Sequence, residues 1–370
     1  MICFSTQSIN YQINSEIRIL KKKGKDKNMK GNCDQMNETG KNRINKYDNL
    51  KGLAIILIVF ANFIIAADAS LSVLKNFIFI FDLPIFFFVS GYFSKSSFDE
   101  INNSFKRLMV PYFILVIVLK IIYSLFNIEF KGVPFIVPQF GLWFLLSLFT
   151  MKLILNITKK LKHPIIISII IGLLIGFISC PVDYLSFART FAYMPIFLIG
   201  YHYNDNKETI EKYLKSENLN VCLLLLFIII AAILAYFLPL DVIKFTVVYN
   251  KQINFALIDL LKRFAVITTG IVLTLLLNKL MDNKHTILTK IGKNSMVIYI
   301  SHIILYFPLT MMVPKLIQAY PVLNNAMGYL LIAIIVTSII VFIFSNDSIS
   351  KYYNKMIDWI YELFFKTKDI

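Results

Sequence analysis

The chain has 370 residues, of which 57% are hydrophobic and only 16% are charged. A soluble domain carries about a quarter charged residues, so this composition excludes an ordinary soluble enzyme and indicates burial in lipid. The formal net charge of +16 could neutralise nucleic-acid phosphates, but membrane proteins also concentrate Lys and Arg in cytoplasmic loops. We therefore interpret the positive charge as a topology signal and expect no nucleic-acid partner.

The first 45 residues are polar and basic, with the run KKKGKDKNMK at 21–30. They contain no apolar core followed by a small-residue cleavage site, which a secretory signal peptide needs. We expect residues 1–45 to form a disordered, basic cytoplasmic tail.

The rest of the chain is divided into long apolar runs. A helix needs about 20 apolar residues to cross a hydrocarbon core about 30 Å thick. The runs therefore predict an all-α fold, a polytopic membrane bundle of about ten transmembrane helices. The predicted helices cover 51–67, 74–93, 108–126, 138–156, 164–180, 188–203, 219–238, 256–279, 294–314 and 323–345.

Basic residues alternate between the two sets of connections. With the N-terminus inside, the cytoplasmic connections hold Lys95, Lys106, Arg107, Lys152, Lys159, Lys160, Lys162, Lys207, Lys212, Lys215, Lys279, Lys284, Lys290 and Lys293. Four outer connections hold only Lys75, Lys131, Arg189 and Lys315, and the exception, 239–263, holds Lys244, Lys251, Lys262 and Arg263. This alternation predicts a multi-pass protein of the plasma membrane with both termini in the cytoplasm.

The last segment, 346–370, has an amphipathic pattern. One helical face would carry Ile349, Tyr352, Tyr353, Met356, Ile360, Leu363 and Phe364, and charged residues fill the other face. This pattern is typical of a helix that lies in the membrane interface and contacts lipid. We expect it to anchor the chain.

The first two predicted helices contain the most notable polar residues. Asn62 lies eleven residues after Lys51, which is about 16 Å deeper along a helix. Asp82 lies about eight residues into the returning helix, so both side chains should reach similar depths. Pro84 frees a backbone carbonyl beside Asp82, which suits a distortion that lines a cavity. The alternatives are that Asn62 only bridges helices and that Asp82 pairs with one basic residue.

Later helices add four candidates. Arg189 and Arg263 lie near the outer side and could bind an anionic group bidentately, or they could extend to the interface. Trp143 fits an interface belt. His302 lies about two turns into its helix and could carry protons, because imidazole titrates near neutral pH, or it could bond a neighbouring helix.

Several motifs are missing from the sequence. It has no Gly-rich Walker loop, no Gly-x-Ser-x-Gly elbow and no His/Cys constellation with metal-ligand spacing. The four cysteines are scattered without redox spacing. We expect neither ATP hydrolysis nor a bound metal.

Six segments in consistent order resemble the acyltransferase 3 family, in particular its fucose 4-O-acetylase-like branch. The resemblance covers about residues 46–345. The segments are YDNLKGLAIILIVFAN, FDLPIFFFVSGYF, RLMVPY, GLWFLLSLF, FARTFAYMPIFLIGY and NSMVIYISH. The second of them, with its Pro-x-Phe-Phe-Phe-x-Ser-Gly-Tyr run, is the most specific.

The resemblance implies transfer of an acyl group, often acetyl from acetyl-CoA, to a carbohydrate or lipid-linked glycan. That reaction needs a base for the sugar hydroxyl and polar groups for the developing oxyanion. By the resemblance, Lys51 and Arg107 would lie on the donor side. Asp82, Asn62 and His302 would form the reaction centre. Trp143, Arg189 and Arg263 would face the acceptor.

The chain departs from the family pattern at important positions. The family motif in the first helix places a histidine where Asn62 stands, and the branch usually has a histidine where Asp82 stands. Ser104 replaces the first arginine of an Arg-x-x-Arg motif. An amide cannot serve as a base, which leaves three interpretations: an O-acyltransferase that uses Asp82 or His302 as the base, a relative that exports or flips a glycan, and an inactive scaffold partner.

Overall fold

The computed structural model describes residues 44–65, 69–130, 132–178, 184–213 and 216–365. The tail predicted for residues 1–45 lies almost wholly outside these described residues. Every regular element in the described ranges is helical, as the sequence predicts.

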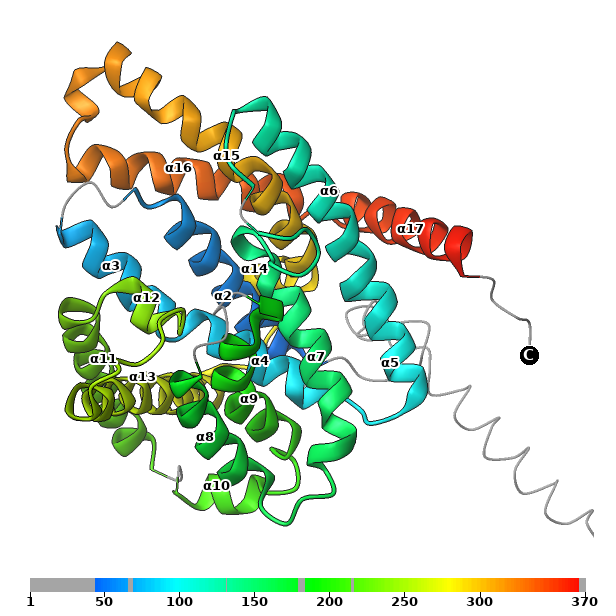
Figure 1. Ribbon diagram of the computed structural model, residues 1–370, viewed down its shortest axis with the longest axis vertical. Coiled ribbons are helices and arrows are strands. Elements are labelled where there is room, and N and C mark those ends of the chain that lie inside the picture. The colour runs from blue at the N-terminus through cyan, green and yellow to red at the C-terminus, as the bar shows by residue number, and fades with distance from the viewer. Residues whose placement is uncertain (1–43, 66–68, 131, 179–183, 214–215, 366–370) are drawn as a thin grey trace, which may run out of the picture. The chain divides into compact units, whose positions relative to one another are not determined.

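The helices follow one another with short connections (Figure 1). They are α2 (Asn45–Phe63), α3 (Ala69–Phe79), α4 (Asp82–Phe93), α5 (Phe98–Ser104), η2 (Phe105–Met109), α6 (Val110–Leu125), η3 (Phe140–Leu142), α7 (Trp143–Thr158), α8 (Pro164–Leu174), η4 (Ile175–Phe177), η5 (Tyr184–Ser186), α9 (Phe187–Tyr201), α10 (Lys207–Tyr213), α11 (Glu217–Phe237), α12 (Leu240–Ile243), α13 (Ile253–Leu280), α14 (Ile287–Lys293), α15 (Ser295–Ala319), η6 (Pro321–Leu323), α16 (Ala326–Phe344) and α17 (Asp347–Phe364).

Seven helical segments of the described chain are long and apolar enough to cross a membrane. They are Ala69–Phe93, Phe98–Leu125, Phe140–Thr158, Glu217–Phe237, Ile253–Leu280, Ser295–Ala319 and Ala326–Phe344. Each coincides with a predicted transmembrane run, so the multi-pass membrane character is confirmed.

The other three predicted runs, 51–67, 164–180 and 188–203, are also helical. They correspond to α2, to α8 with η4, and to α9. Helix α2 has 19 residues with charges at its start, α8 has 11 residues and is followed by η4, and α9 has 15 residues. Their short length or their charges keep these helices out of the group of seven candidate spans. The number of about ten transmembrane helices therefore remains a prediction.

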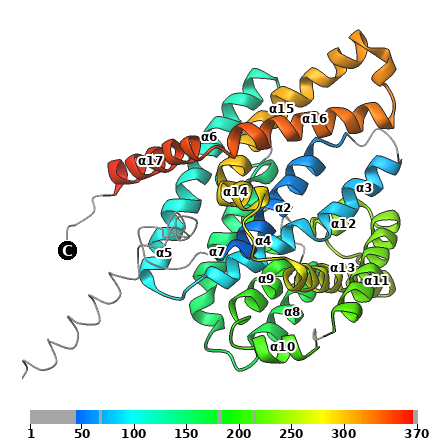
Figure 2. The ribbon, with the colours of Figure 1, turned by 180° about the vertical axis from the view of Figure 1, so that it is seen from behind.

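Helix α2 lies among the others and packs against α3, α4, α13, α14, α15 and α16. Figures 1 and 2 show it between α4 and α16 from both sides. Small residues allow this close packing: the backbone of Leu288 lies against Gly52, and the backbone of Asp48 lies against Gly292. We use the two ends of α2, the Asn45 end and the Phe63 end, to name the two ends of the bundle.

The predicted run 74–93 is broken in its middle. Helix α3 ends at Phe79, a turn follows, and α4 begins at Asp82. Pro84 lies in the first turn of α4, where the missing N–H removes no helical hydrogen bond. Asp82 therefore stands at a helix N-terminus, where backbone N–H groups favour a carboxylate.

Helices α4 and α9 cross at two glycines. The backbone of Phe197 lies against Gly91, and the backbone of Phe88 lies against Gly200, so that a Cβ at either glycine would collide with a carbonyl oxygen. The close crossing brings Tyr193 of α9 against α4, and this fixes one wall of the region around Asp82.

The C-terminal segment contains α17, which packs on α6 and η2. Lys106 of η2 forms an ion pair of 2.8 Å with Asp358 of α17. Both views show α17 beside α6 (Figures 1 and 2). Its place in a membrane interface remains a prediction.

Candidate functional site

The structure brings Asn62 of α2 and His302 of α15 together. Nδ2 of Asn62 donates a hydrogen bond of 3.0 Å to the carbonyl of Ile58 and lies 3.5 Å from Nε2 of His302. The Ile58 carbonyl can only accept, which identifies the atom as the amide nitrogen, and an amide nitrogen does not accept. Nε2 of His302 is therefore the acceptor in this contact.

The same geometry determines the tautomer of His302. A neutral imidazole whose Nε2 accepts carries its proton on Nδ1. Nδ1 of His302 has no hydrogen-bond partner among the described residues. The side chain is only 1% exposed. His302 thus offers a lone pair on Nε2 toward α2.

Aromatic residues hold the His302 ring. The ring of Tyr299 lies 5.1 Å from it in an edge arrangement, and the ring of Phe140 lies at 6.2 Å. The Tyr299 hydroxyl donates to the carbonyl of Gly141. A Cβ at Gly141 would be about 3.1 Å from that hydroxyl, so the glycine lets the chain before α7 approach α15.

Asp82 is fully buried at the start of α4. Its Oδ1 accepts a hydrogen bond of 2.6 Å from the backbone N–H of Leu83. Its Oδ2 has no hydrogen-bond partner among the described residues. Lys244 interacts with Asp82 by electrostatic attraction, although no direct ion pair joins the two in the described part of the chain.

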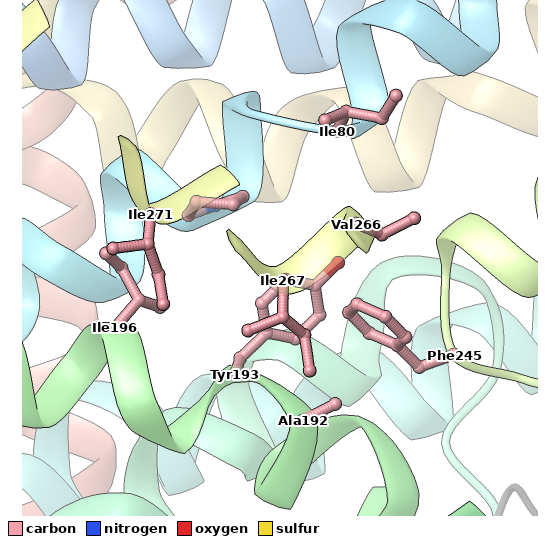
Figure 3. A pocket seen from close by; sticks show the side chains of 9 residues that line it. Ile80, Ala192, Tyr193, Ile196, Phe245, Val266, Ile267 and Ile271 are labelled. Atoms are coloured by element: carbon pink, nitrogen blue, oxygen red, sulfur yellow. The ribbon is translucent and has the colours of Figure 1, made fainter. Parts of the chain in front are cut away.

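Asn62 and Asp82 have different neighbours. The structure gives Asn62 a histidine from α15 as its polar partner, and no hydrogen bond between described atoms connects it with Asp82. A small cavity of about 10 Å³ lies beside Pro84, large enough for about one water molecule. Figure 3 shows Tyr193, Phe245 and Ile267 around it.

The predicted acceptor-side residues form two aromatic contacts. The guanidinium of Arg189 lies 4.9 Å from the ring of Trp143. Trp143 is buried and stacks at 5.9 Å on Tyr193, which in turn stacks at 4.8 Å on Phe87. Trp143 thus supports Arg189 from inside the bundle.

Arg263 lies inside α13 and is only 3% exposed. Nη2 donates a hydrogen bond of 3.4 Å to the carbonyl of Phe245, and the guanidinium lies 5.2 Å from the Phe245 ring and 5.5 Å from the Tyr249 ring. Nη1 has no hydrogen-bond partner among the residues that the structure describes. Such burial excludes an extended, interface-seeking side chain.

Three functional candidates were not predicted: Tyr193, Lys75 and Lys244. Tyr193 joins Trp143 to Phe245, whose ring is 5.1 Å away. Nζ of Lys75 donates to the carbonyl of Ile64 at 3.0 Å, and Nζ of Lys244 lies 4.0 Å from the Phe79 ring. The excess of basic residues in 239–263 was the sequence signal for Lys244.

The predicted donor-side residues lie at the Asn45 end. Lys51 forms an ion pair of 2.8 Å with Asp48. Arg107 lines a cavity of about 390 Å³ together with Lys293, Asn294 and Tyr353. The lining of this cavity does not include Lys51, and α14, which packs on α2, contributes its last residue, Lys293, to the lining.

The chain was compared with known proteins and families. The model of a family described as an acyltransferase domain, acyltransferase 3, matches residues 44–345. No curated protein matches the chain. No solved structure matches it either. The matched range covers every site residue named above except Tyr353 of α17.

Proposed function

Because the chain belongs to the acyltransferase 3 family, we propose that it is a membrane O-acyltransferase that moves an acetyl group from acetyl-CoA to a carbohydrate or lipid-linked glycan. The family implies an acyl donor. The identity of the donor, the carbohydrate acceptor and the residue roles below belong to this proposal.

The observation that carries the proposal is the 3.5 Å contact between Asn62 and Nε2 of His302. Asn62 occupies the position where the family motif has a histidine, and a histidine from α15 reaches this position. The base would thus be supplied by α15 instead of α2. Imidazole suits this role because the neutral ring carries a lone pair on one nitrogen that can accept a proton.

The proposed reaction balances as follows. Nε2 of His302 takes the proton of the acceptor hydroxyl while the hydroxyl oxygen bonds to the thioester carbon. The C–S bond then breaks, and the imidazolium returns the proton to the leaving sulfur, which gives the ester and CoA.

Asn62 would have a different role from the family histidine. Its contact with His302 is long for a hydrogen bond, so an acceptor hydroxyl could replace it at Nε2. The freed amide N–H could then donate to the developing oxyanion.

The donor would bind at the Asn45 end. The cavity beside Arg107 also contains Lys293 and Asn294, which suits a phosphate-bearing group. Lys51 is half-buried beside Asp48 and would add positive charge from α2. This arrangement agrees with the predicted cytoplasmic position of this end.

Asp82 is the second candidate base. Its unpartnered Oδ2 could take a proton, and Leu83 holds its Oδ1. The replacement of family histidines at Asn62 and Asp82 also favours a second function, export or flipping of a glycan without acyl-CoA turnover. Both ideas make predictions that differ from those for His302.

Acetyl transfer by the purified full-length protein in lipid nanodiscs tests the proposal. We expect His302→Gln to lower the transfer rate at least about 100-fold, as loss of a general base does. The exposed His163 provides a matched control, and His163→Gln should leave the rate unchanged. Asp82→Asn should lower it less than His302→Gln.

The other outcomes decide against parts of the proposal. Loss of transfer in Asp82→Asn with a retained rate in His302→Gln would assign the base to Asp82. Absence of acetyl-CoA turnover with every carbohydrate acceptor, together with glycan flux that depends on Asp82, would favour export.

A further inference from the structure

Four cations gather near the Phe63 end of the bundle, and we call them the outer cation cluster. They come from α3, from α9, from the connection after α12 and from α13: Lys75, Arg189, Lys244 and Arg263. Electrostatic coupling links them, because Lys75 and Arg189 both act on Lys244, and Arg189 and Arg263 both act on Tyr193. Residues far apart in the sequence thus share one region.

Three of these cations, Lys75, Lys244 and Arg263, contact neutral groups. Lys75 donates to a backbone carbonyl, Lys244 lies on the face of Phe79, and Arg263 contacts a carbonyl and two aromatic rings. Within the described residues, no carboxylate forms an ion pair with these three. Carbonyls and aromatic rings orient a cation, but they do not cancel its charge.

The cluster is electrostatically strained. Burial, together with the charges of Lys75 and Arg189, lowers the pKa of Lys244 to about 8, while Asp82 and Asp241 oppose the shift. Asp82 is the only fully buried carboxylate among these groups, and Asp241 is exposed. Among the described residues, the three buried or half-buried cations Lys75, Lys244 and Arg263 thus outnumber the one fully buried carboxylate, Asp82, which is costly unless an anion completes the site.

A purely structural role does not explain the cluster well. A structural lysine or arginine normally extends its charge to water or pairs it. Arg263 does neither, since it is 3% exposed and its Nη1 has no partner in the described chain. An unsatisfied guanidinium N–H of this kind is suited to an oxygen anion.

We propose that the outer cation cluster binds an anionic group of the acceptor, so that the acceptor class is a glycan bearing carboxylate or phosphate. This inference rests on the proposed acyltransferase function and specifies its substrate. Lys244 and Arg189 would contact the anion first because they are partly exposed, and Arg263 would complete the site from below.

Binding by the full-length protein in phosphatidylcholine nanodiscs tests the inference. The probes are an oligogalacturonate, its neutral methyl ester and a sugar phosphate. We expect at least one anionic probe to bind about tenfold tighter than the ester, as a charge-assisted hydrogen bond allows. Equal binding of all three probes would overturn the inference.

Variants assign the binding to the cluster. Lys244→Gln and Arg263→Gln should each lower anion affinity about tenfold, whereas the exposed Lys251→Gln in the same connection should not change it. An equal loss in Lys251→Gln would contradict the inference. Lys244 lies outside the long helices, so its variant keeps the test valid if Arg263→Gln does not fold.

A second lipid composition separates the possible sources of the anion. Phosphatidylglycerol in the nanodiscs should leave the binding of the anionic sugar within a factor of about two. If it abolishes that binding, the cluster binds lipid headgroups and the assignment to the acceptor is wrong. Anion binding without any acetyl transfer would instead reject the proposed reaction and leave the binding site established.

Discussion

Three lysines at the Asn45 end and three cations of the outer cation cluster have different partners. At the Asn45 end, Lys51, Lys106 and Lys152 pair with Asp48, Asp358 and Glu100 at 2.8, 2.8 and 2.7 Å. At the Phe63 end, Lys75, Lys244 and Arg263 contact carbonyls and aromatic rings. Charges that are paired inside the protein contribute to its structure, whereas charges left without a counter-ion indicate a ligand.

The Asn45 end also has a buried polar residue that is fully bonded. Nδ2 of Asn49 donates to the carbonyls of Asp282 and Lys284 at 3.1 and 2.9 Å, and its Oδ1 accepts from Thr286 and Thr289 at 3.0 and 2.6 Å. These bonds connect α2 with α14 and with the chain before it. This end is therefore built as a rigid frame.

The largest stability effect should come from this frame. Asn49→Ala removes four hydrogen bonds at a site that is 1% exposed. We expect a loss of about 3 kcal/mol in the free energy of unfolding, because two threonine hydroxyls and two carbonyls lose their partner. Denaturant unfolding in detergent measures this change. A loss below about 1 kcal/mol would show that the frame is not rigid.

Lysine removal should have opposite effects at the two ends. Lys152→Gln breaks a partly buried ion pair and should lower stability by up to about 1 kcal/mol. Lys244→Gln removes a charge that its surroundings disfavour, and it should leave stability unchanged or raise it. The same unfolding measurement applied to both variants checks the signs. If Lys244→Gln destabilises as much as Lys152→Gln, the contrast between the ends is wrong.

The smallest effect is a pH dependence. The pKa of folded Lys244 is about 8, lowered by burial and then by Lys75 and Arg189, against 10.5 for an ordinary lysine. The unfolded chain therefore binds more protons between these values, and stability rises with pH in that window. We expect the melting temperature of the wild type, relative to that of Lys244→Gln, to rise from pH 7.5 to pH 9.5.

Binding of the anionic sugar should depend on pH with the opposite sign. Lys244 loses its charge as the pH rises through about 8, so the affinity should fall between pH 7 and pH 9, and the fall should be absent in Lys244→Gln. Lys75, Arg189, Asp82 and Asp241 act on Lys244 from the neighbouring elements. A fall of equal size in the variant would assign the titration to another group.

The helices could be predicted from the sequence because apolar length and charge at the ends are local properties. A distortion near Asp82 was also predicted, from Pro84, but the complete break between α3 and α4 in the run 74–93 was not. The pairing of Asn62 with His302 could not be predicted in this way. It depends on α15 packing against α2 across 240 residues, whereas the sequence favoured the neighbour in the chain, α4.

The outer cation cluster shows the same limitation. From the sequence, Arg189 and Arg263 were each predicted as a candidate by itself, and the connection 239–263 was noted for its excess of basic residues. That Lys75 and Lys244 join them follows from the packing of α3 beside α11 and α12. Tyr193 was also not predicted as a site residue, because aromatic residues are common in membrane helices and its stacking partners cannot be read from the sequence.

An exchange of the two residues in α2 and α15 tests the role of His302 most directly. Acetyl transfer is measured for the wild type, for His302→Asn and for the double variant Asn62→His with His302→Asn. We expect the single variant to lose at least about 100-fold in rate and the double variant to recover much of it, because the imidazole returns to the position it has in the family motif. Full activity in His302→Asn would contradict a base on α15.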